Sequence, residues 1–539
     1  MSLPPTAFAT RVFFDECVAS AQPLSEPGRA RAHAFGAFGP GSETELMRFW
    51  DRTDAFIGLL RDHPTTLLEA HLKNCNGLWF LQEDPMSWGA VELARLHAVS
   101  SSCRWIRAQI ADRLAQDFGA VADLGPILEL LTPHCAGGGF QFAAEAGSEL
   151  ARERAQLAEA TDRYLALEKD LREQVAARLG VSAARLKSDL TVPIEDDAKL
   201  QLYRAIGELA EITQHPHQVQ FRFTPTQEAR EAHTIMTRLR QRCHARETAQ
   251  LADLCGRLAP LLPRLQQELA HVGELDLLFG RARWALALRA VRPRISDDGT
   301  LLAVDAMHPV IRDQVEGLDR QYQLLSFCLQ PPVVSLTGAN MGGKTAFLRT
   351  VGLLQTLFQL GYFIPAREFA SRPVRSMAWV GAAPDSPVLG LSSFGRECRD
   401  LVEALQLETP QLLLVDEFAR STDVEDGLAL TGALLDYLRD TRQGLFLFAG
   451  HQKRLVCASE DQIQYLHTGG LDFAAYTRNL EHLEAIPALA ASMNYRIFDG
   501  RTDSSDALQI ALALGVPEKL VRSARIILSA RGEKTQDSI

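Results

Sequence analysis

Hydrophobic positions follow two different patterns along the chain. From about residue 40 to about 290, apolar side chains recur three and four positions apart, which is the spacing of one helix face. The clearest run, 148–179, contains no Pro or Gly, and a second run covers 227–272 with a possible break at Pro260 and Pro263. The stretch between them, 180–226, is less regular. We predict an arm of two long helices with a small tip; an ordinary helical domain with a loop is the alternative.

After about residue 290 the pattern becomes an alternation. Short apolar runs at 332–336, 412–415 and 445–448 alternate with helical periods at 345–360 and 424–439. Buried strands separated by amphipathic helices are typical of an α/β domain with a mostly parallel sheet. The sequence therefore predicts an all-α region followed by an α/β domain.

Composition narrows the class of protein. The 539 residues are enough for two to four domains. No stretch approaches the roughly 18 uncharged apolar residues of a membrane span, and the first residues lack the pattern of a secretory signal. Nine scattered Cys without C-x-x-C spacing fit reduced thiols, so we predict a cytoplasmic protein without membrane contact. The net charge of −11 argues against coating nucleic acid through bulk charge, although a local basic patch stays open.

One segment has the pattern of a phosphate-binding loop, G-x-x-x-x-G-K-[ST], between an apolar strand and a helix. Its residues are Gly338, Ala339, Asn340, Met341, Gly342, Gly343, Lys344 and Thr345. Glycines let successive N–H groups point at phosphate oxygens, and the helix adds its positive N-terminal end. Lys344 can neutralise the β- and γ-phosphates, and the Thr345 hydroxyl can ligate Mg²⁺. We predict that this loop and the next residue, Ala346, bind ATP.

Two later strands end in residues suited to hydrolysis. The apolar strand at 411–415 leads into Asp416 and Glu417. Asp416 can hold the Mg²⁺ hydration shell, and Glu417 is placed to act as general base on the attacking water. A third strand leads into His451, which could sense the γ-phosphate through a water; a structural His is the alternative. We predict catalytic roles for Glu417, Lys344 and His451.

These elements together resemble the ATPase domain of the MutS family. The loop from Thr337 to Thr345 is similar to that family's T-G-P-N-M-G-G-K-S and departs from it at Ala339 and Thr345. Residues 416–422 resemble D-E-I-G-R-G-T with both glycines replaced, and 308–310 match its H-P-V. The resemblance implies an ABC-like P-loop NTPase domain that uses ATP and Mg²⁺, and it adds His308 to the ATP-binding residues.

Three further segments carry the resemblance with differences. Residues 390–394 with Glu397 resemble G-x-S-T-F-x-x-E, whose first Ser reaches the ATP of the neighbouring subunit; mapped here, Ser392 acts in trans, which implies a homodimer. Gly450 replaces the Thr of the family's A-T-H. Residues 505–508 replace S-Y-G-L, which leaves the adenine contacts open, with Tyr322 as a candidate for stacking on the base.

The resemblance also suggests a division of the whole chain. Residues 223–228 resemble R-[FY]-T-T-P-E-L, where the family's chain leaves its DNA clamp, and 275–282 resemble the L-D-x-L-x-x-x-A ahead of the ATPase. The predicted parts are an N-terminal segment at 1–40, a helical core and lever region at 41–290 with a clamp-like tip at about 180–226, the P-loop ATPase domain at 291–500, and a dimerising helix-turn-helix at 501–539.

Two departures bear on function. The chain has no room for both the mismatch-reading domain and the connector of a full mismatch sensor, so we expect a shortened member that lacks them. Phe14-Asp15-Glu16 matches the F-x-E that reads a mispaired base, and we interpret this match as coincidence. The segment 185–222 carries five basic and six acidic residues, whereas a surface that grips DNA needs several phosphate-neutralising side chains.

Two functions follow. The first is a homodimeric ATPase that couples hydrolysis to binding of duplex DNA in mismatch repair or recombination. The alternative is ATP-driven remodelling or reactivation of a protein partner, such as an aminomutase, without DNA binding.

Overall fold

The computed structural model describes residues 6–62, 65–114, 122–142, 148–186, 189–338, 342–381, 393–420, 422–450, 462–480, 484–501 and 507–536. The chain forms two compact units. The sheet unit comprises 1–76, 106–119 and 269–539, and the arm unit comprises 77–105 and 120–268. This grouping differs from the predicted division, because residues 41–76 belong with the sheet. The predicted domain boundaries themselves stay predictions.

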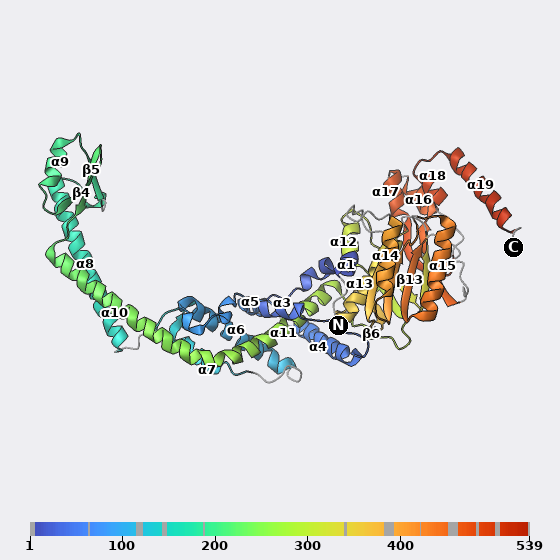
Figure 1. The fold of residues 1–539 in the computed structure, drawn as a ribbon, viewed down its shortest axis with the longest axis horizontal. Coiled ribbons are helices and arrows are strands. Elements are labelled where there is room, and N and C mark those ends of the chain that lie inside the picture. Colours follow the sequence, from blue (N-terminus) through green and yellow to red (C-terminus); the bar gives the residue numbers. More distant parts are fainter. Residues whose placement is uncertain are drawn as a thin grey trace. The chain divides into compact units, whose positions relative to one another are not determined.

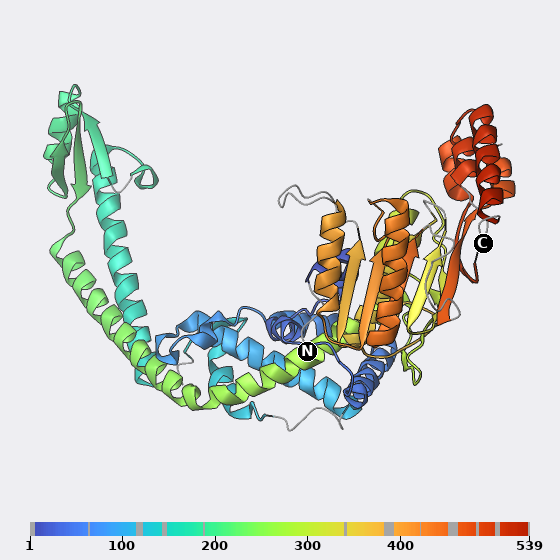
Figure 2. The ribbon, with the colours of Figure 1, turned by 45° about the vertical axis from the view of Figure 1, so that its right-hand side comes forward.

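Two long helices, α8 (Glu149–Leu179) and α10 (Gln227–Leu258), run side by side in the arm unit (Figures 1 and 2). The side chains of Ser148 and Thr226 each accept a hydrogen bond from an N–H group of the first turn that follows, which caps the helix. Gly180 ends α8 in the left-handed conformation with φ 62°. The predicted helix over 148–179 is confirmed.

The second predicted helical run, 227–272, is divided in the structure. After α10, a 3₁₀ turn (Ala259–Leu261) with a proline leads into α11 (Leu262–Leu288). The proline lacks the N–H that would continue the α-helical hydrogen-bond pattern, which accounts for the break.

A small antiparallel sheet lies between the long helices in sequence. Its order is β3 (Asp189–Pro193), β5 (Gln218–Phe223) and β4 (Leu209–Gln214), and α9 (Asp197–Arg204) packs beside it. The core of this tip contains apolar side chains from α8 and the sheet, among them Leu171, Val175, Val192, Val219 and Phe221. The other elements that precede α8 in this part of the chain are α6 (Ala90–Leu114), α7 (Gly125–Leu131), β1 (Cys135–Ala136) and β2 (Gly139–Phe140).

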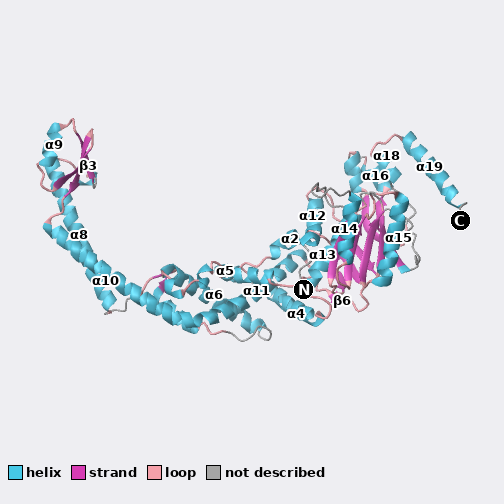
Figure 3. Cartoon of the chain, viewed as in Figure 1, coloured by secondary structure: helices cyan, strands magenta, loops and turns pink. Residues whose placement is uncertain are grey.

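A six-stranded sheet is the centre of the sheet unit (Figure 3). Its strands in spatial order are β11 (Ser376–Gly381), β12 (Gln411–Asp416), β13 (Gly444–Gly450), β9 (Val333–Thr337), β14 (Ile463–Leu471) and β15 (Met493–Asp499). The pairs from β11 to β14 are parallel and β15 is antiparallel, which is the mostly parallel arrangement that the sequence predicts.

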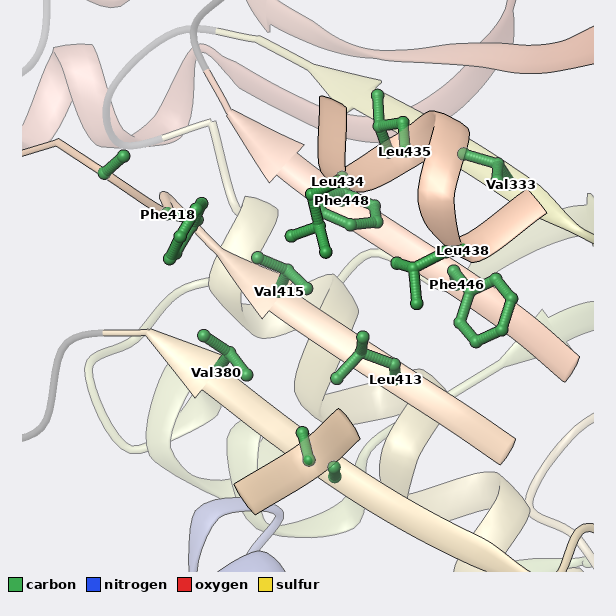
Figure 4. Packing of buried hydrophobic residues seen from close by; sticks show 13 residues of the cluster. Val333, Val380, Leu413, Val415, Phe418, Leu434, Leu435, Leu438, Phe446 and Phe448 are labelled. Carbon is green, nitrogen blue, oxygen red and sulfur yellow. The ribbon is translucent and has the colours of Figure 1, made fainter. Parts of the chain in front are cut away.

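Helices cover both faces of this sheet. On one face, α14 (Ser393–Leu405) and α15 (Val424–Thr441) contribute to the apolar cluster in Figure 4. The other face carries α13 (Lys344–Gln359), which is buried on nearly all sides. The Phe347 ring of α13 lies 4.8 Å from that of Phe327 in a second sheet. This second sheet has the order β6 (Arg294–Ile295), β10 (Glu368–Ser371), β7 (Leu301–Ala306) and β8 (Leu325–Leu329).

The first residues of the chain pack on α13. In the segment of α1 (Thr6–Arg11) and α2 (Phe14–Val18), Phe8 and Val12 are buried against Gly352. Phe14 is also buried, with its ring 6.3 Å from that of Tyr362. The Phe of the F-x-E match therefore lies in the core of the sheet unit, whereas Glu16 is exposed.

The remaining helices of the sheet unit are α3 (Glu26–His33), α4 (Glu43–Asp62), α5 (Thr66–Asn74), α12 (Pro309–Glu316), α16 (Phe473–Asn479), α17 (Ala485–Ala491), α18 (Ala507–Ala513) and α19 (Glu518–Gln536). The last two are the predicted helix-turn-helix, and its role in dimerisation stays a prediction. Within the described part of the chain, no helix is both long and apolar enough to cross a membrane.

The contact at Gly352 leads to a first prediction. A Cβ added there would lie 2.8 Å from Val12 Cγ1 and 3.2 Å from Phe8 Cζ, whereas one added at Gly58 in α4 would have no atom within 4 Å. We expect Gly352→Ala to lower the free energy of unfolding by roughly 1–3 kcal/mol through overpacking. Gly58→Ala, the control, should raise it by about 0.5–1 kcal/mol. Denaturant unfolding measures both, and equal stability of Gly352→Ala and the parent would contradict the packing.

Candidate nucleotide site

The predicted phosphate loop joins the end of β9 to the start of α13. Gly343 precedes the helix with φ 85°, a left-handed conformation that glycine adopts without steric cost. The Lys344 ammonium donates to the carbonyl of Gly338 at 2.9 Å, so this side chain connects the two ends of the loop. Gly342 and Ala346 lie in the same loop and in the first turn of α13. The positive N-terminal end of a helix favours an anion, because its first N–H groups have no acceptor within the helix.

The Asp416 carboxylate faces the start of the same helix. The Thr345 hydroxyl donates to Asp416 Oδ2 at 2.9 Å. The other oxygen, Oδ1, is buried and has no hydrogen-bond partner among the described residues. Burial is the main cause that raises the pKa of Asp416, and the hydrogen bond from Thr345 opposes it. A hydroxyl beside a buried, unpaired carboxylate oxygen is a set of hard oxygen ligands that suits Mg²⁺.

Glu417 also lies beside the Lys344 ammonium. Its Oε1 is 3.7 Å from Lys344 Nζ, and its Oε2 is 2.6 Å from a guanidinium nitrogen of Arg420. Only 5% of the Lys344 side chain is exposed. Burial lowers the pKa of Lys344, and the charges of Glu417 and Asp416 oppose that shift. The structure thus brings the loop, the Thr–Asp pair and Glu417 together, while their catalytic roles stay predictions.

His308 and Tyr322, both predicted to bind ATP, form hydrogen bonds with other parts of the protein. The His308 ring is fully buried, with Nε2 3.2 Å from the carbonyl of Val12, and Nδ1 accepts from the N–H of Ile311 at 3.4 Å. The Tyr322 hydroxyl accepts from the N–H of His308 at 2.9 Å. These bonds fix the start of α12. Contacts of His308 and Tyr322 with ATP stay predictions, and these hydrogen bonds within the protein do not support them.

Five of the predicted site residues lie outside the described residues. They are Ala339, Asn340 and Met341 of the loop, the trans residue Ser392, and His451.

Two side chains near the loop, Tyr495 and Thr468, were not predicted, and the resemblance that includes Glu397 gave no contact for it. The Tyr495 ring lies so close to Gly343 that a Cβ there would be 2.8 Å from its Cδ1. Thr468 contacts Gly338, and its buried hydroxyl has no hydrogen-bond partner among the described residues. Glu397 is buried and accepts from the N–H of Ala419 at 2.8 Å. Tyr495 and Thr468 come from β15 and β14, so no local motif could have indicated them.

A cavity of about 220 Å³ lies beside Glu417 at the carboxyl ends of the central strands. Its lining includes Thr337 from β9, Gly450 from β13, and Ala419 and Arg420 from the loop after β12. Glu417 therefore lines a cavity next to the predicted phosphate loop.

Fold and site together define an α/β protein with a phosphate loop at the carboxyl edge of a parallel sheet. Comparison with known proteins is consistent with this class: the family model described as MutS domain V matches residues 334–530. The chain is 28% identical over 312 residues to the DNA mismatch repair protein MutS of Staphylococcus carnosus, covering 57% of this chain and 34% of that protein. It is 30% identical over 271 residues to the same-named protein of Staphylococcus aureus strain JH9, covering 49% and 29%.

The chain is therefore similar to MutS proteins over about half of its length, and residues 334–530 match the MutS domain V model. It spans about a third of the length of the curated relatives it matches.

Burial of His308 generates a second prediction. Desolvation lowers the pKa of His308 from 6.5 to about 4. The neutral ring therefore contributes stability above pH 6.5 that is lost as the pH falls toward 4, by at most about 3 kcal/mol. We expect His308→Asn, which keeps a side-chain acceptor for the start of α12, to show a smaller loss of stability over that range. Denaturant unfolding at several pH values measures the difference, and equal slopes would contradict it.

Proposed function

We propose that the protein is a Mg²⁺-dependent ATPase that works as a homodimer. The observation that carries this proposal is the hydrogen bond from Thr345 to one oxygen of Asp416 while the other oxygen stays buried and unpaired. A hydroxyl and a carboxylate beside a phosphate loop are the protein ligands that Mg²⁺ takes next to a nucleotide. Lys344 and Glu417, 3.7 Å apart, stand beside that pair with the charges that phosphate binding and water activation require.

Each residue has a separate task in the proposed mechanism. Lys344 exchanges its bond to the Gly338 carbonyl for the phosphates, which the loop N–H groups also bind. Thr345 and Asp416 hold the Mg²⁺, which when bound neutralises charge on the β- and γ-phosphates. Glu417 orients the attacking water and accepts its proton.

The dimer supplies further contacts in this proposal. Ser392 reaches the nucleotide of the partner subunit, and His451 senses the γ-phosphate. Tyr322 has its hydroxyl bonded to His308, so the Tyr495 ring beside Gly343 is the better-placed aromatic surface for the nucleotide.

We propose DNA binding in mismatch repair or recombination as the process that hydrolysis drives. The support is the similarity to the MutS domain V model and to two curated relatives that are DNA mismatch repair proteins by name. The paired helices of the arm unit with a separate tip give the protein a long surface on which a duplex could lie.

The tip favours a second candidate, ATP-driven remodelling of a protein partner. Three of its arginines are paired with carboxylates: Arg178 with Glu208 at 2.8 Å, Arg204 with Glu211 at 3.0 Å, and Arg222 with Asp189 at 3.1 Å. Charges neutralised in this way attract DNA phosphates less. The same tip exposes apolar side chains, Val181, Leu202 and Ile212, each 44% exposed. Paired charges and exposed apolar groups suit a protein surface better than a polyanion.

Substitution of the general base tests the ATPase. We expect Glu417→Gln to bind ATP with unchanged affinity and to lose roughly 100-fold or more in kcat, because the amide cannot accept the proton. It should accumulate as an ATP-bound dimer, visible by light scattering. Lys344→Ala should lose ATP binding itself, and Glu408→Gln, an exposed glutamate before β12, is the matched control. Hydrolysis by Glu417→Gln at the parental rate would show that another group is the base.

Binding to duplex, mismatched and branched DNA at several salt concentrations separates the two candidates. DNA binding should weaken steeply with salt, because each neutralised phosphate makes the slope of log K against log salt more negative by about 0.9. The triple variant Glu208→Gln, Glu211→Gln, Asp189→Asn frees the three arginines and should bind more tightly if the tip contacts DNA. No binding at low salt, with or without ATP, would favour the protein partner.

A further inference from the structure

The loop that follows Asp416 is held in an uncommon backbone conformation. Glu417 has φ 54° and Ala419 has φ 60°, so both residues are left-handed although neither is a glycine. Side chains with a Cβ rarely take this conformation without support from their surroundings. The loop is also tightly packed: a Cβ added at Gly427 of α15 would lie 2.9 Å from the carbonyl oxygen of Ala419.

One buried carboxylate supports this loop. Glu397 lies in the second turn of α14 and is 5% exposed. Its Oε2 accepts the N–H of Ala419 at 2.8 Å, and Ala419 is itself 6% exposed. Burial raises the pKa of Glu397, whereas the bond from Ala419 lowers it. A buried carboxylate is costly unless it is hydrogen-bonded, so its bond to Ala419 gives this residue a defined partner.

The neighbours of the pair are apolar. Phe418 and Ala419 belong to the cluster that also contains Val415 of β12, with Phe394 and Leu401 of α14 packed against it. These contacts fill space and set no direction for the backbone. The hydrogen bond from Ala419 N–H to Glu397 is directional, and it joins α14 to the loop that carries Glu417.

We propose that Glu397 is a positioning residue: it holds Ala419 in its left-handed conformation and thereby sets the direction in which Glu417, two residues earlier, presents its carboxylate. The inference rests on the proposed role of Glu417 in hydrolysis. Glu397 belongs to α14, and Ser392, the residue proposed to reach the partner's nucleotide, comes one position before this helix in the sequence.

Kinetics of three variants test the positioning. Glu397→Leu removes the acceptor at similar size and should lower kcat by about 10- to 100-fold, while the dissociation constant for a fluorescent ATP analogue changes less than about 2-fold, because Lys344 and the loop are untouched. Glu397→Gln keeps an acceptor oxygen and should retain most of kcat. Glu403→Leu, on the exposed side of α14, is the control. Equal loss of binding and kcat, or a parental kcat in Glu397→Leu, would overturn the proposal.

A stability cycle tests the same contact without enzyme activity. Ala419→Gly removes the Cβ that disfavours the left-handed conformation, so it should raise the unfolding temperature by about 2 °C when Glu397 is present. In the Glu397→Leu background Ala419 is free to leave that conformation, and the gain should vanish. The same gain in both backgrounds would overturn the role of Glu397. A positive cycle in a parent protein that does not hydrolyse ATP would leave the contact standing and refute the proposed function.

Discussion

Three parallel strands, β12, β13 and β9, end in register, with Asp416 beside Ala449 and Gly450 beside Thr337. Because parallel strands bring their carboxyl ends to one edge, this register places the acid pair of β12 next to the loop that leaves β9. The bond between Thr345 and Asp416 depends on it, since a slip of one residue would turn Asp416 to the other face of the sheet. Apolar residues of these strands are buried on both faces of the sheet, and Figure 4 shows the cluster on one of these faces.

The same register concentrates charge in a small volume. Lys344, Asp416 and Glu417 lie together under partial burial, where electrostatic interactions are stronger than in water. Desolvation is the main cause of two pKa shifts that oppose ionisation: the pKa of Asp416 is raised and that of Lys344 is lowered. Because burial destabilises the charged forms of Asp416 and Lys344, a bound cation beside Asp416 and a bound phosphate beside Lys344 would stabilise these charges.

The sequence predicted the parts of the site that are local motifs. The phosphate loop and the acid pair each occupy a few consecutive residues, and the structure places them side by side. The contacts of His308 could not be predicted, because its ring is covered by Val12, which is 296 positions away in the chain. Thr468 and Tyr495 reach the loop only through pairing of β14 with β9 and of β15 with β14. The numbers of basic and acidic residues in the tip could be counted in the sequence. Which arginine pairs with which carboxylate depends on the fold and could not be predicted.

Burial of the first helix against α13 has a consequence for dividing the protein into pieces. The sheet unit is assembled from separated stretches, and Asp276 of α11 accepts hydrogen bonds from both the backbone and the hydroxyl of Ser25. A recombinant fragment that began near residue 290 would lose Phe8 and Val12 and would open the apolar surface around Gly352 to water. Such a surface promotes aggregation. A fragment for studying the nucleotide site alone would have to keep 1–76, 106–119 and 269–539 together.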